Sequence, residues 1–163
     1  MTFTRPASSI KPVPALAYSY DAVGNITKVV SGTDTLAEYT YDNQNQLVSE
    51  DDGQYLTTYT YDTYGNIRSI WVRDSETYSA VLETYEFSYA DDRDWKDQLT
   101  GVTYTDYNSD GKESGMLTYD AMGNPLTYFN GKKSWNFTWK YGRQLASATD
   151  GIHTITNEYD VDG

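Results

Sequence analysis

A nine-residue phrase recurs along this chain of 163 residues and constrains its fold more than any other feature. One copy, at residues 59–67, reads YTYDTYGNI. Three close copies, one with Asn in the glycine position and one ending in Pro, lie at residues 18–26, 39–47 and 117–125. Looser copies lie at residues 87–89, 137–143 and 157–160, and the anchor aromatics occupy positions 20, 41, 61, 89, 119, 139 and 159. Most separations are close to 20 residues, and a fixed period of this length indicates a repeat architecture.

Each repeat predicts a β-hairpin. Tyr59 and Tyr61 alternate with threonine and therefore share one face of a strand. Asp62 suits the first position of a type I turn, and Gly65 suits the left-handed position of a G1 bulge. Asn45 fits the same position, because asparagine tolerates the left-handed region. A tyrosine face on every hairpin predicts a layer of stacked rings.

The turn fixes which residues pair across each hairpin. The expected cross-strand pairs are Tyr61 with Ile67, Tyr20 with Ile26 and Tyr41 with Leu47. We assign the following residues to the structural repeat motif: Tyr20, Asp21, Gly24, Tyr41, Asp42, Asn45, Tyr61, Asp62, Gly65, Tyr119, Asp120, Gly123, Tyr159 and Asp160.

Short turn signals separate the hairpins, so the strands should form a continuous antiparallel meander. Residues 90–100 interrupt the period with a charged stretch, for which we predict a solvated loop with one helical turn at residues 95–99. Residues 1–14 contain three prolines and predict an irregular lead-in to a repeat domain over residues 15–163. The sequence stops in mid-hairpin at Asp160-Val161-Asp162-Gly163, which predicts that it is part of a longer protein.

Composition excludes several classes of protein. The net charge is −12, which argues against nucleic-acid binding because such proteins need basic patches. There is no cysteine, so no disulfide scaffold, thiol nucleophile or thiolate metal ligand is available. No segment is long and apolar enough for a membrane span, and residues 1–14 lack the apolar core of a signal peptide.

At these motifs the chain resembles the Rhs/YD-repeat family. The family pattern Tyr-Asp-x-x-Gly-(Asn/Arg)-(Ile/Leu) matches residues 20–26 and 61–67 fully. It matches residues 41–47 with Asn for Gly, and residues 119–125 with Pro last. Residues 95–100, followed by the repeat at 119–125, are similar to the stretch near the end of the repeat region in large bacterial members.

The resemblance implies an all-β strip of hairpins that forms part of a spiralling shell. Members include bacterial wall-associated and Rhs polymorphic toxins, the shell component of insecticidal toxin complexes, and teneurins. In toxin members the shell encloses a C-terminal toxin, which an aspartyl autoprotease releases. The resemblance therefore implies a non-catalytic encapsulating module of a secreted or cell-surface bacterial protein. Its partners would be neighbouring YD repeats and the enclosed toxin, whose domain would lie beyond Gly163.

One other pattern in the sequence predicts a candidate calcium site. Asp106, Asn108 and Asp110 have the spacing of the first half of a calcium loop, followed by Gly111. The loop departs from the pattern at its twelfth position, where Leu117 replaces the bidentate glutamate. The only histidine, His153, has no neighbouring nucleophile pattern, so a structural or surface role is expected. No cofactor is expected.

Two other functions remain open from the residues alone. Trp71, Trp135 and Trp139 could stack on sugar rings, which would make the chain a carbohydrate-binding or adhesion module. Abundant acids leave a glycosidase as a third hypothesis. An open strip also has unpaired edge strands, so we expect self-association through edges such as residues 154–159 or through an aromatic face.

Overall fold

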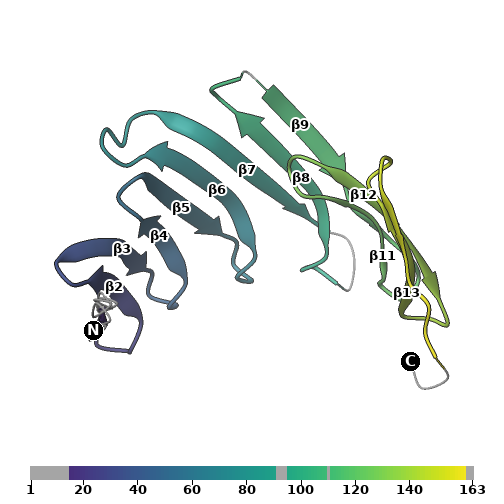
Figure 1. The fold of residues 1–163 in the computed structure, drawn as a ribbon, viewed down its shortest axis with the longest axis horizontal. Coiled ribbons are helices and arrows are strands. Elements are labelled where there is room, and N and C mark those ends of the chain that lie inside the picture. Colours follow the sequence, from purple (N-terminus) through teal and green to yellow (C-terminus); the bar gives the residue numbers. More distant parts are fainter. Residues whose placement is uncertain (1–14, 91–94, 110, 161–163) are drawn as a thin grey trace, which may run out of the picture.

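We analysed a computed structural model of the chain, and the structure describes residues 15–90, 95–109 and 111–160. All regular elements in these ranges are β-strands, and they form two antiparallel sheets that do not close into a barrel (Figure 1). This confirms the predicted all-β class and curved strip. No helix in the described ranges is long and apolar enough to cross a membrane. The predicted lead-in over residues 1–14 lies outside the described residues.

The first sheet contains nine strands in sequence order. Its strands are β1 (Leu16–Tyr20), β2 (Ile26–Ser31), β3 (Asp34–Tyr41), β4 (Leu47–Asp51), β5 (Tyr55–Tyr61), β6 (Ile67–Asp74), β7 (Val81–Tyr89), β8 (Leu99–Asp106) and β9 (Gly111–Met116). The second sheet contains β10 (Thr118–Tyr119), β11 (Pro125–Phe129), β12 (Ser134–Lys140), β13 (Gln144–Thr149) and β14 (Thr154–Thr156). Every strand pairs with its sequence neighbours within its own sheet, so the topology is a simple meander.

The predicted cross-strand register is confirmed. Tyr61 lies opposite Ile67, and the ladder shifts by one residue between Thr60 and Tyr61. The same shift occurs one residue before the anchor in the other hairpins with a full or near-full motif. A one-residue shift is what an extra bulge residue produces.

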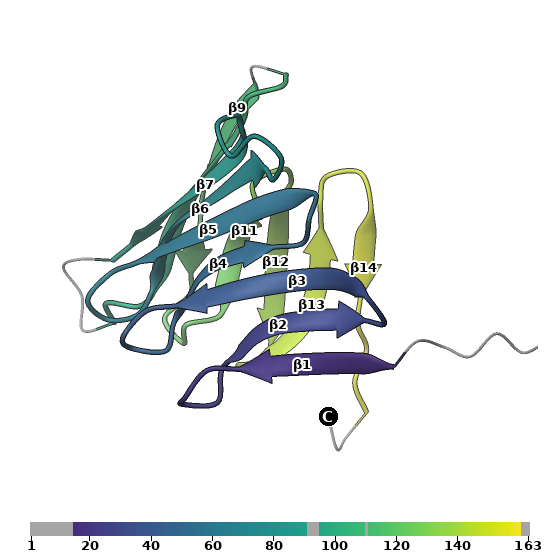
Figure 2. The same ribbon diagram turned by 90° about the vertical axis from the view of Figure 1, so that its left-hand side faces the viewer.

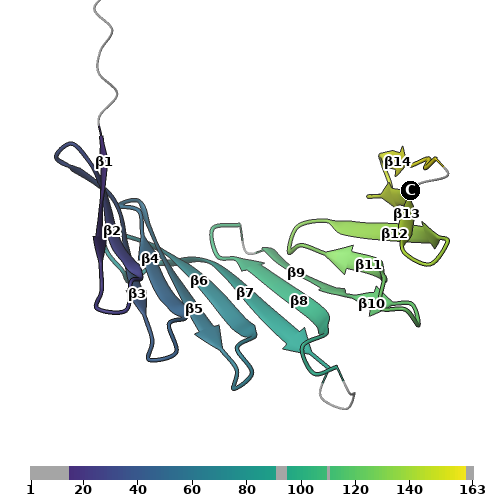
Figure 3. The same cartoon turned by 90° about the horizontal axis from the view of Figure 1, so that it is seen from below.

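The expected continuous meander is wrong at one point. The first sheet ends at Met116, and the second begins at Thr118 after the single residue Leu117. The backbone N–H of Leu117 still donates to the carbonyl of Thr100, at 2.9 Å. Beyond it the chain turns, and β11 crosses near β9 instead of extending the sheet (Figure 3).

The second sheet folds over the tyrosine-bearing face of the first. Figures 1 and 2 show a long curved sheet whose C-terminal end is covered by β11 and β12. The contact is direct: a Cβ added to Gly115 would lie 2.3 Å from the Cβ of Phe129. We call the region from β7 to β11 the corner, and the region from β1 to β6 the strip. The tyrosine-bearing face is therefore the concave face.

The apolar core lies at the corner. Val102, Leu117 and Phe129 are buried together there, each about 4–6% exposed. Side chains from β7, the start of β8 and β10 pack around them: Tyr85, Phe87, Leu99 and Tyr119. Most strip side chains are only half-buried, because one sheet face alone cannot cover them.

The segment before β8 also differs from expectation. No helical turn forms at residues 95–99. Instead, the N–H of Gln98 donates to the carbonyl of Trp95, at 3.2 Å, and Leu99 already begins β8. The reason is pairing: Leu99 lies opposite Tyr89 as the cross-strand partner of that anchor. Of the solvated loop predicted for residues 90–100, residues 91–94 fall outside the described residues.

Candidate functional site: a ladder between repeats

The repeat turns are built around their aspartates. In the hairpin of Asp62, one carboxylate oxygen accepts the backbone N–H groups of Tyr64 and Asn66, at 2.8 and 3.0 Å. The other oxygen accepts the Asn66 side-chain amide, at 3.1 Å. Gly65 has φ of +88°, the left-handed position of the predicted bulge. The motif Asp-x-x-Gly-Asn is thus a self-capping turn.

The other motif turns repeat these bonds. Asp21 and Asp120 each accept two backbone N–H groups and the amide of the following motif asparagine. Asp42 accepts two backbone N–H groups, and Asn45 takes the left-handed position with φ of +62°. The sequence predicted the aspartate and glycine roles, but the side-chain bond from asparagine was not anticipated.

These bonds favour ionised aspartates. Donation from the Asn124 amide, with help from backbone N–H groups, holds the pKa of Asp120 below its usual value despite partial burial. At Asp21, burial is the largest effect and raises the pKa, but the amide and backbone bonds together outweigh it and lower the pKa. The turns therefore carry fixed negative charge at neutral pH.

The anchor aromatics connect consecutive repeats through hydrogen bonds. The hydroxyl of Tyr61 donates to the carbonyl of Leu47, at 2.7 Å, and Leu47 is the residue paired with the previous anchor, Tyr41. Six anchors obey the same rule. The rungs are Tyr41 to Ile26 (2.9 Å), Tyr61 to Leu47 (2.7 Å), Tyr89 to Ile67 (2.9 Å), Tyr119 to Leu99 (2.8 Å), Trp139 to Pro125 (2.7 Å) and Tyr159 to Leu145 (3.0 Å).

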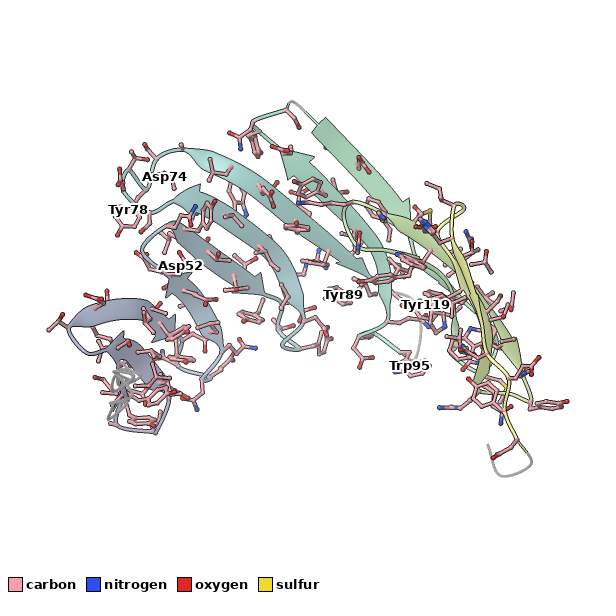
Figure 4. All side chains as sticks on the ribbon, viewed as in Figure 1. Asp52, Asp74, Tyr78, Tyr89, Trp95 and Tyr119 are labelled. Atoms are coloured by element: carbon pink, nitrogen blue, oxygen red, sulfur yellow. The ribbon has the colours of Figure 1, made fainter. Side chains whose placement is uncertain are left out.

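We call this set of bonds the ladder. All of its rungs point the same way, from an anchor back to the preceding hairpin. At the fifth rung the indole Nε1–H of Trp139 replaces a tyrosine hydroxyl. Figure 4 shows Tyr89 of β7 and Tyr119 of β10, and the Tyr119 rung, to Leu99 of β8, spans the break between the two sheets. The ladder therefore crosses from the first sheet to the second without interruption.

The expected layer of stacked rings is not what holds the tyrosines. In the described ranges, one ring pair is found, between Tyr85 and Tyr104 with centroids 4.9 Å apart. The anchors are spaced by two strands, so their rings reach a carbonyl more readily than another anchor ring. Burial, with the charge of Asp42 adding to it, raises the pKa of Tyr61, which keeps its hydroxyl protonated as a donor.

Tyr20 begins the ladder without a rung. Its side chain is 60% exposed, and its hydroxyl has no acceptor among the described residues. It lies on β1, an edge strand whose residues are all exposed. At the other end, β14 is also an edge, and Ile155 is 57% exposed. In the described part of the chain, the edge strands β1 and β14 are therefore open to pairing.

The opposite face carries paired hydroxyls instead of tyrosines. Thr60 and Ser69 lie 2.7 Å apart across β5 and β6, and Thr138 and Ser147 lie 2.7 Å apart across β12 and β13. These residues alternate with the anchors, so they occupy the convex face of the curved sheet. The two faces therefore differ in chemistry.

A lysine fastens the second sheet to the first. Lys132, in the turn between β11 and β12, lies 3.4 Å from Glu83 and 4.9 Å from the ring centroid of Tyr104. Gly131 beside it lies so close to Tyr85 that an added Cβ would sit 2.7 Å from the ring. The Tyr85 hydroxyl donates to the other oxygen of Glu83, at 3.2 Å. We call Glu83, Tyr85 and Tyr104 the occupied cradle.

Two loops make further contacts beyond the ladder. The Trp95 ring lies against the turn of the next repeat, because a Cβ on Gly123 would be 2.7 Å from it (Figure 4). Tyr78, at φ of +53°, reaches back from the loop after β6 and donates to Asp51, at 3.0 Å. Ser75 also donates to Asp51, at 2.6 Å. Both loops therefore add contacts between neighbouring repeats.

The predicted calcium residues are only partly described. The carboxylate of Asp106 accepts the N–H of Asn108, at 2.9 Å, which is ordinary turn capping. Asp110 lies outside the described residues. Leu117, at the twelfth loop position, is buried in the corner core. In the described ranges no group of three His, Cys, Asp or Glu residues could hold a metal ion, so the calcium site stays a prediction.

The other candidate residues have local roles. His153 lies in the last hairpin turn, 3.5 Å from Asp150. Trp71 has the Arg73 guanidinium 5.2 Å from its ring centroid, and Trp139 is held by its rung. Both tryptophans are half-buried, as is Trp135.

Comparisons with known proteins agree with the repeat assignment. Residues 20–56 match the family model described as RHS Repeat, which confirms the resemblance to the Rhs/YD-repeat family at these residues. No curated protein matches the chain.

Two solved structures resemble the chain over most of its length. One is a Photorhabdus luminescens Tc holotoxin pore with a mutation in TccC3, at 14% identity, 90% coverage of this chain and a TM-score of 0.35. The other is a complex of TcdB2, TccC3 and Cdc42, at 14% identity, 89% coverage and a TM-score of 0.36. The chain spans 10% of the length of the matched chain in each of these structures.

Proposed function

We propose that the chain is a non-catalytic segment of a β-shell wall. In this proposal the shell encloses a C-terminal toxin or effector within a large secreted or cell-surface bacterial protein. The ladder carries the proposal, since six rungs of one direction tie each hairpin to the one before it. The match to the RHS Repeat model supports the same function.

The ladder suits a wall because it is additive. Each rung joins neighbouring hairpins only, so stability grows with every hairpin, as in other repeat proteins. The corner supplies what a regular ladder lacks, a change of direction fixed by an apolar core. A row of hairpins that both extends and changes direction can surround a volume. Neighbouring YD repeats are then the partners at the two open edges.

Protease protection in the full-length parent protein tests this function. We expect the C-terminal segment to resist digestion while the wall is intact. The double variant Tyr61→Phe with Tyr119→Phe removes two rungs and should speed digestion of that segment. Tyr141→Phe is the matched control, because this tyrosine is 90% exposed. If the C-terminal segment is digested as fast in the unaltered protein as in the double variant, the proposal is overturned.

The open edges predict how the isolated chain behaves. Unpaired strand edges pair readily with other chains, and charge repulsion is partly screened at physiological salt. We expect concentration-dependent association by light scattering, reduced by Ile155→Lys on β14 and by Tyr18→Lys on β1. A compact, strictly monomeric particle at high concentration would contradict the open-edge assignment.

The carbohydrate-binding hypothesis stays a prediction. A glycan array with the isolated chain tests it, with Trp135→Ala as the comparison variant. Binding that this substitution abolishes would favour an adhesion module over a wall segment, whereas an array without signal would remove the hypothesis.

A further inference from the structure

The occupied cradle shows what this concave surface does with a cation. Glu83 and Tyr85 lie two residues apart on β7, and Tyr104 lies directly opposite Tyr85 on β8. Into this group the chain inserts its own Lys132, which meets a carboxylate at 3.4 Å and a ring face at 4.9 Å. A carboxylate flanked by aromatic faces is favourable for an ammonium group, since the ion pair and the cation–π attraction act together.

A second group of the same composition lies on the strip. Glu50 of β4 pairs directly with Tyr39 of β3 and with Thr57 of β5. Tyr59 lies two residues beyond Thr57, so it shares this face and is the diagonal neighbour of Glu50. We call Glu50, Tyr39 and Tyr59 the open cradle. All three side chains are half-buried.

The titration of the two tyrosines agrees with this placement. The pKa of Tyr59 is raised, first by burial and then by the negative charge of Glu50. The pKa of Tyr39 is raised by burial and then by the same charge. The charge of Glu50 therefore acts on both tyrosines, as their shared face and direct or diagonal pairing require.

The open cradle lacks the cation that fills its counterpart. In the described ranges, no lysine or arginine pairs with Glu50. Lys28 pairs with Glu38 instead, at 2.8 Å. Arg73 bonds to Thr58 and covers Trp71. Both Glu38 and Thr58 alternate with the cradle residues along their strands, which places those cations on the convex face.

We propose that the open cradle binds a lysine side chain of another polypeptide segment, as the occupied cradle binds Lys132. This proposal rests on the proposed function to the extent that the segment is enclosed cargo lying against the concave face. The binding chemistry itself belongs to this chain and does not depend on the shell.

The test is a titration of the chain with Nα-acetyl-lysine methylamide, followed through ¹³C-labelled tyrosine ring signals in NMR. We expect saturable shifts at Tyr39 and Tyr59. The matched norleucine derivative has the same stem without the charge and should leave these signals in place. Saturable shifts with norleucine, or none with lysine, would overturn the proposal.

Two variants locate the site. Glu50→Gln keeps the shape of the side chain and should weaken binding about tenfold or more, because a charged partner is lost. Glu86→Gln removes the same charge from the opposite face of β7 and should leave the affinity unchanged. Equal weakening by both variants would mean that net charge, not the cradle, attracts the probe.

A third variant compares the two cradles in the same chain. Lys132→Met should empty the occupied cradle, so the lysine probe should then also shift Tyr85 and Tyr104. If it shifts neither pair, the chemistry assigned to both cradles is wrong. Failure of the shell would appear separately, as a digested C-terminal segment in the parent protein while the ring shifts in this chain persist.

Discussion

The strip and the corner are made from the same hairpin but are stabilised in different ways. From β1 to β6 the anchors are 20 or 21 residues apart, and Ala37 is the one buried apolar residue found there in the described ranges. In the corner the separations rise to 28 and 30 residues, and Ala90, Val102, Tyr104, Leu117 and Phe129 are buried. A regular repeat thus gives a ladder of hydrogen bonds, whereas the departure from the period gives a core.

The difference goes with the added residues. They lie in β6 and β7, of eight and nine residues, in the loop between these strands, in β8 and in the segment before β8. A longer strand exposes more of its concave face, and the second sheet covers that face with Phe129 and Lys132. The irregular spacing is therefore where the chain acquires tertiary packing.

The two regions should differ most in stability when a buried side chain of the apolar core is removed. Phe129→Ala should destabilise the chain by about 3–5 kcal/mol, because a buried aromatic leaves a cavity. Ile67→Ala, in the half-buried strip, should cost about 1–2 kcal/mol, since less surface and volume are lost. Urea unfolding measures both. Equal losses would mean that the corner has no special role in stability.

Substitutions of turn glycines should destabilise the chain to different extents in the two regions. Gly65→Val should cost about 1–2 kcal/mol, because a β-branched residue is forced into the left-handed region, and Gly65→Asn clearly less. Gly123→Asn should cost more than Gly65→Asn, since its Cβ would meet the Trp95 ring at 2.7 Å, not the flexible end of Gln46 at 3.2 Å. Adding Trp95→Ala should remove that difference. Equal effects of Val and Asn at position 65 would refute the bulge assignment.

Single rungs of the ladder should have moderate effects. Tyr61→Phe removes the donor to the Leu47 carbonyl and should destabilise the chain by about 0.5–1.5 kcal/mol. Tyr20→Phe is the natural control, because Tyr20 has no rung in the described structure, and it should change stability little. Comparable losses in thermal melts of the two variants would show that the loss does not come from the rung to Leu47.

Acid should weaken the strip before the corner. In the strip, bonds from the Ser75 hydroxyl and the Gly53 N–H lower the pKa of Asp51, and the pKa values of Asp21 and Asp62 are also lowered. A lowered folded pKa gives stability that is complete above the ordinary value of 3.8 and is lost as pH falls through the folded pKa. Hydrogen exchange between pH 4 and pH 2 should therefore show β1 to β6 opening first, because only the corner retains apolar packing. Simultaneous opening would contradict the division into two regions.

Calcium should have the smallest effect, and it concerns the corner alone. If Asp106, Asn108 and Asp110 bind the ion, excess calcium should raise the melting temperature relative to chelator, since a ligand that binds only the folded state stabilises it. Asp106→Asn should remove that rise. An unchanged melting temperature would leave this loop as an ordinary turn.

The sequence by itself determined the hairpins and their register. Asp62, Gly65 and the alternation of Tyr59 and Tyr61 are local signals, because a turn and its bulge involve only a few consecutive residues. The direction of the ladder was not visible in the same way. It depends on where the carbonyl of Leu47 lies relative to a tyrosine 14 residues later, which follows from strand twist and spacing and not from residue type.

Only the tertiary structure decided where the chain leaves the first sheet and starts the second. Nothing local marks Leu117 as a break, because its effect depends on Val102 and Phe129 meeting it from strands on either side. The same holds for Lys132, a turn residue that joins two sheets through Glu83, 49 residues away. Contacts of this range depend on how the sheets fold over one another, and the repeat pattern specifies only neighbouring strands.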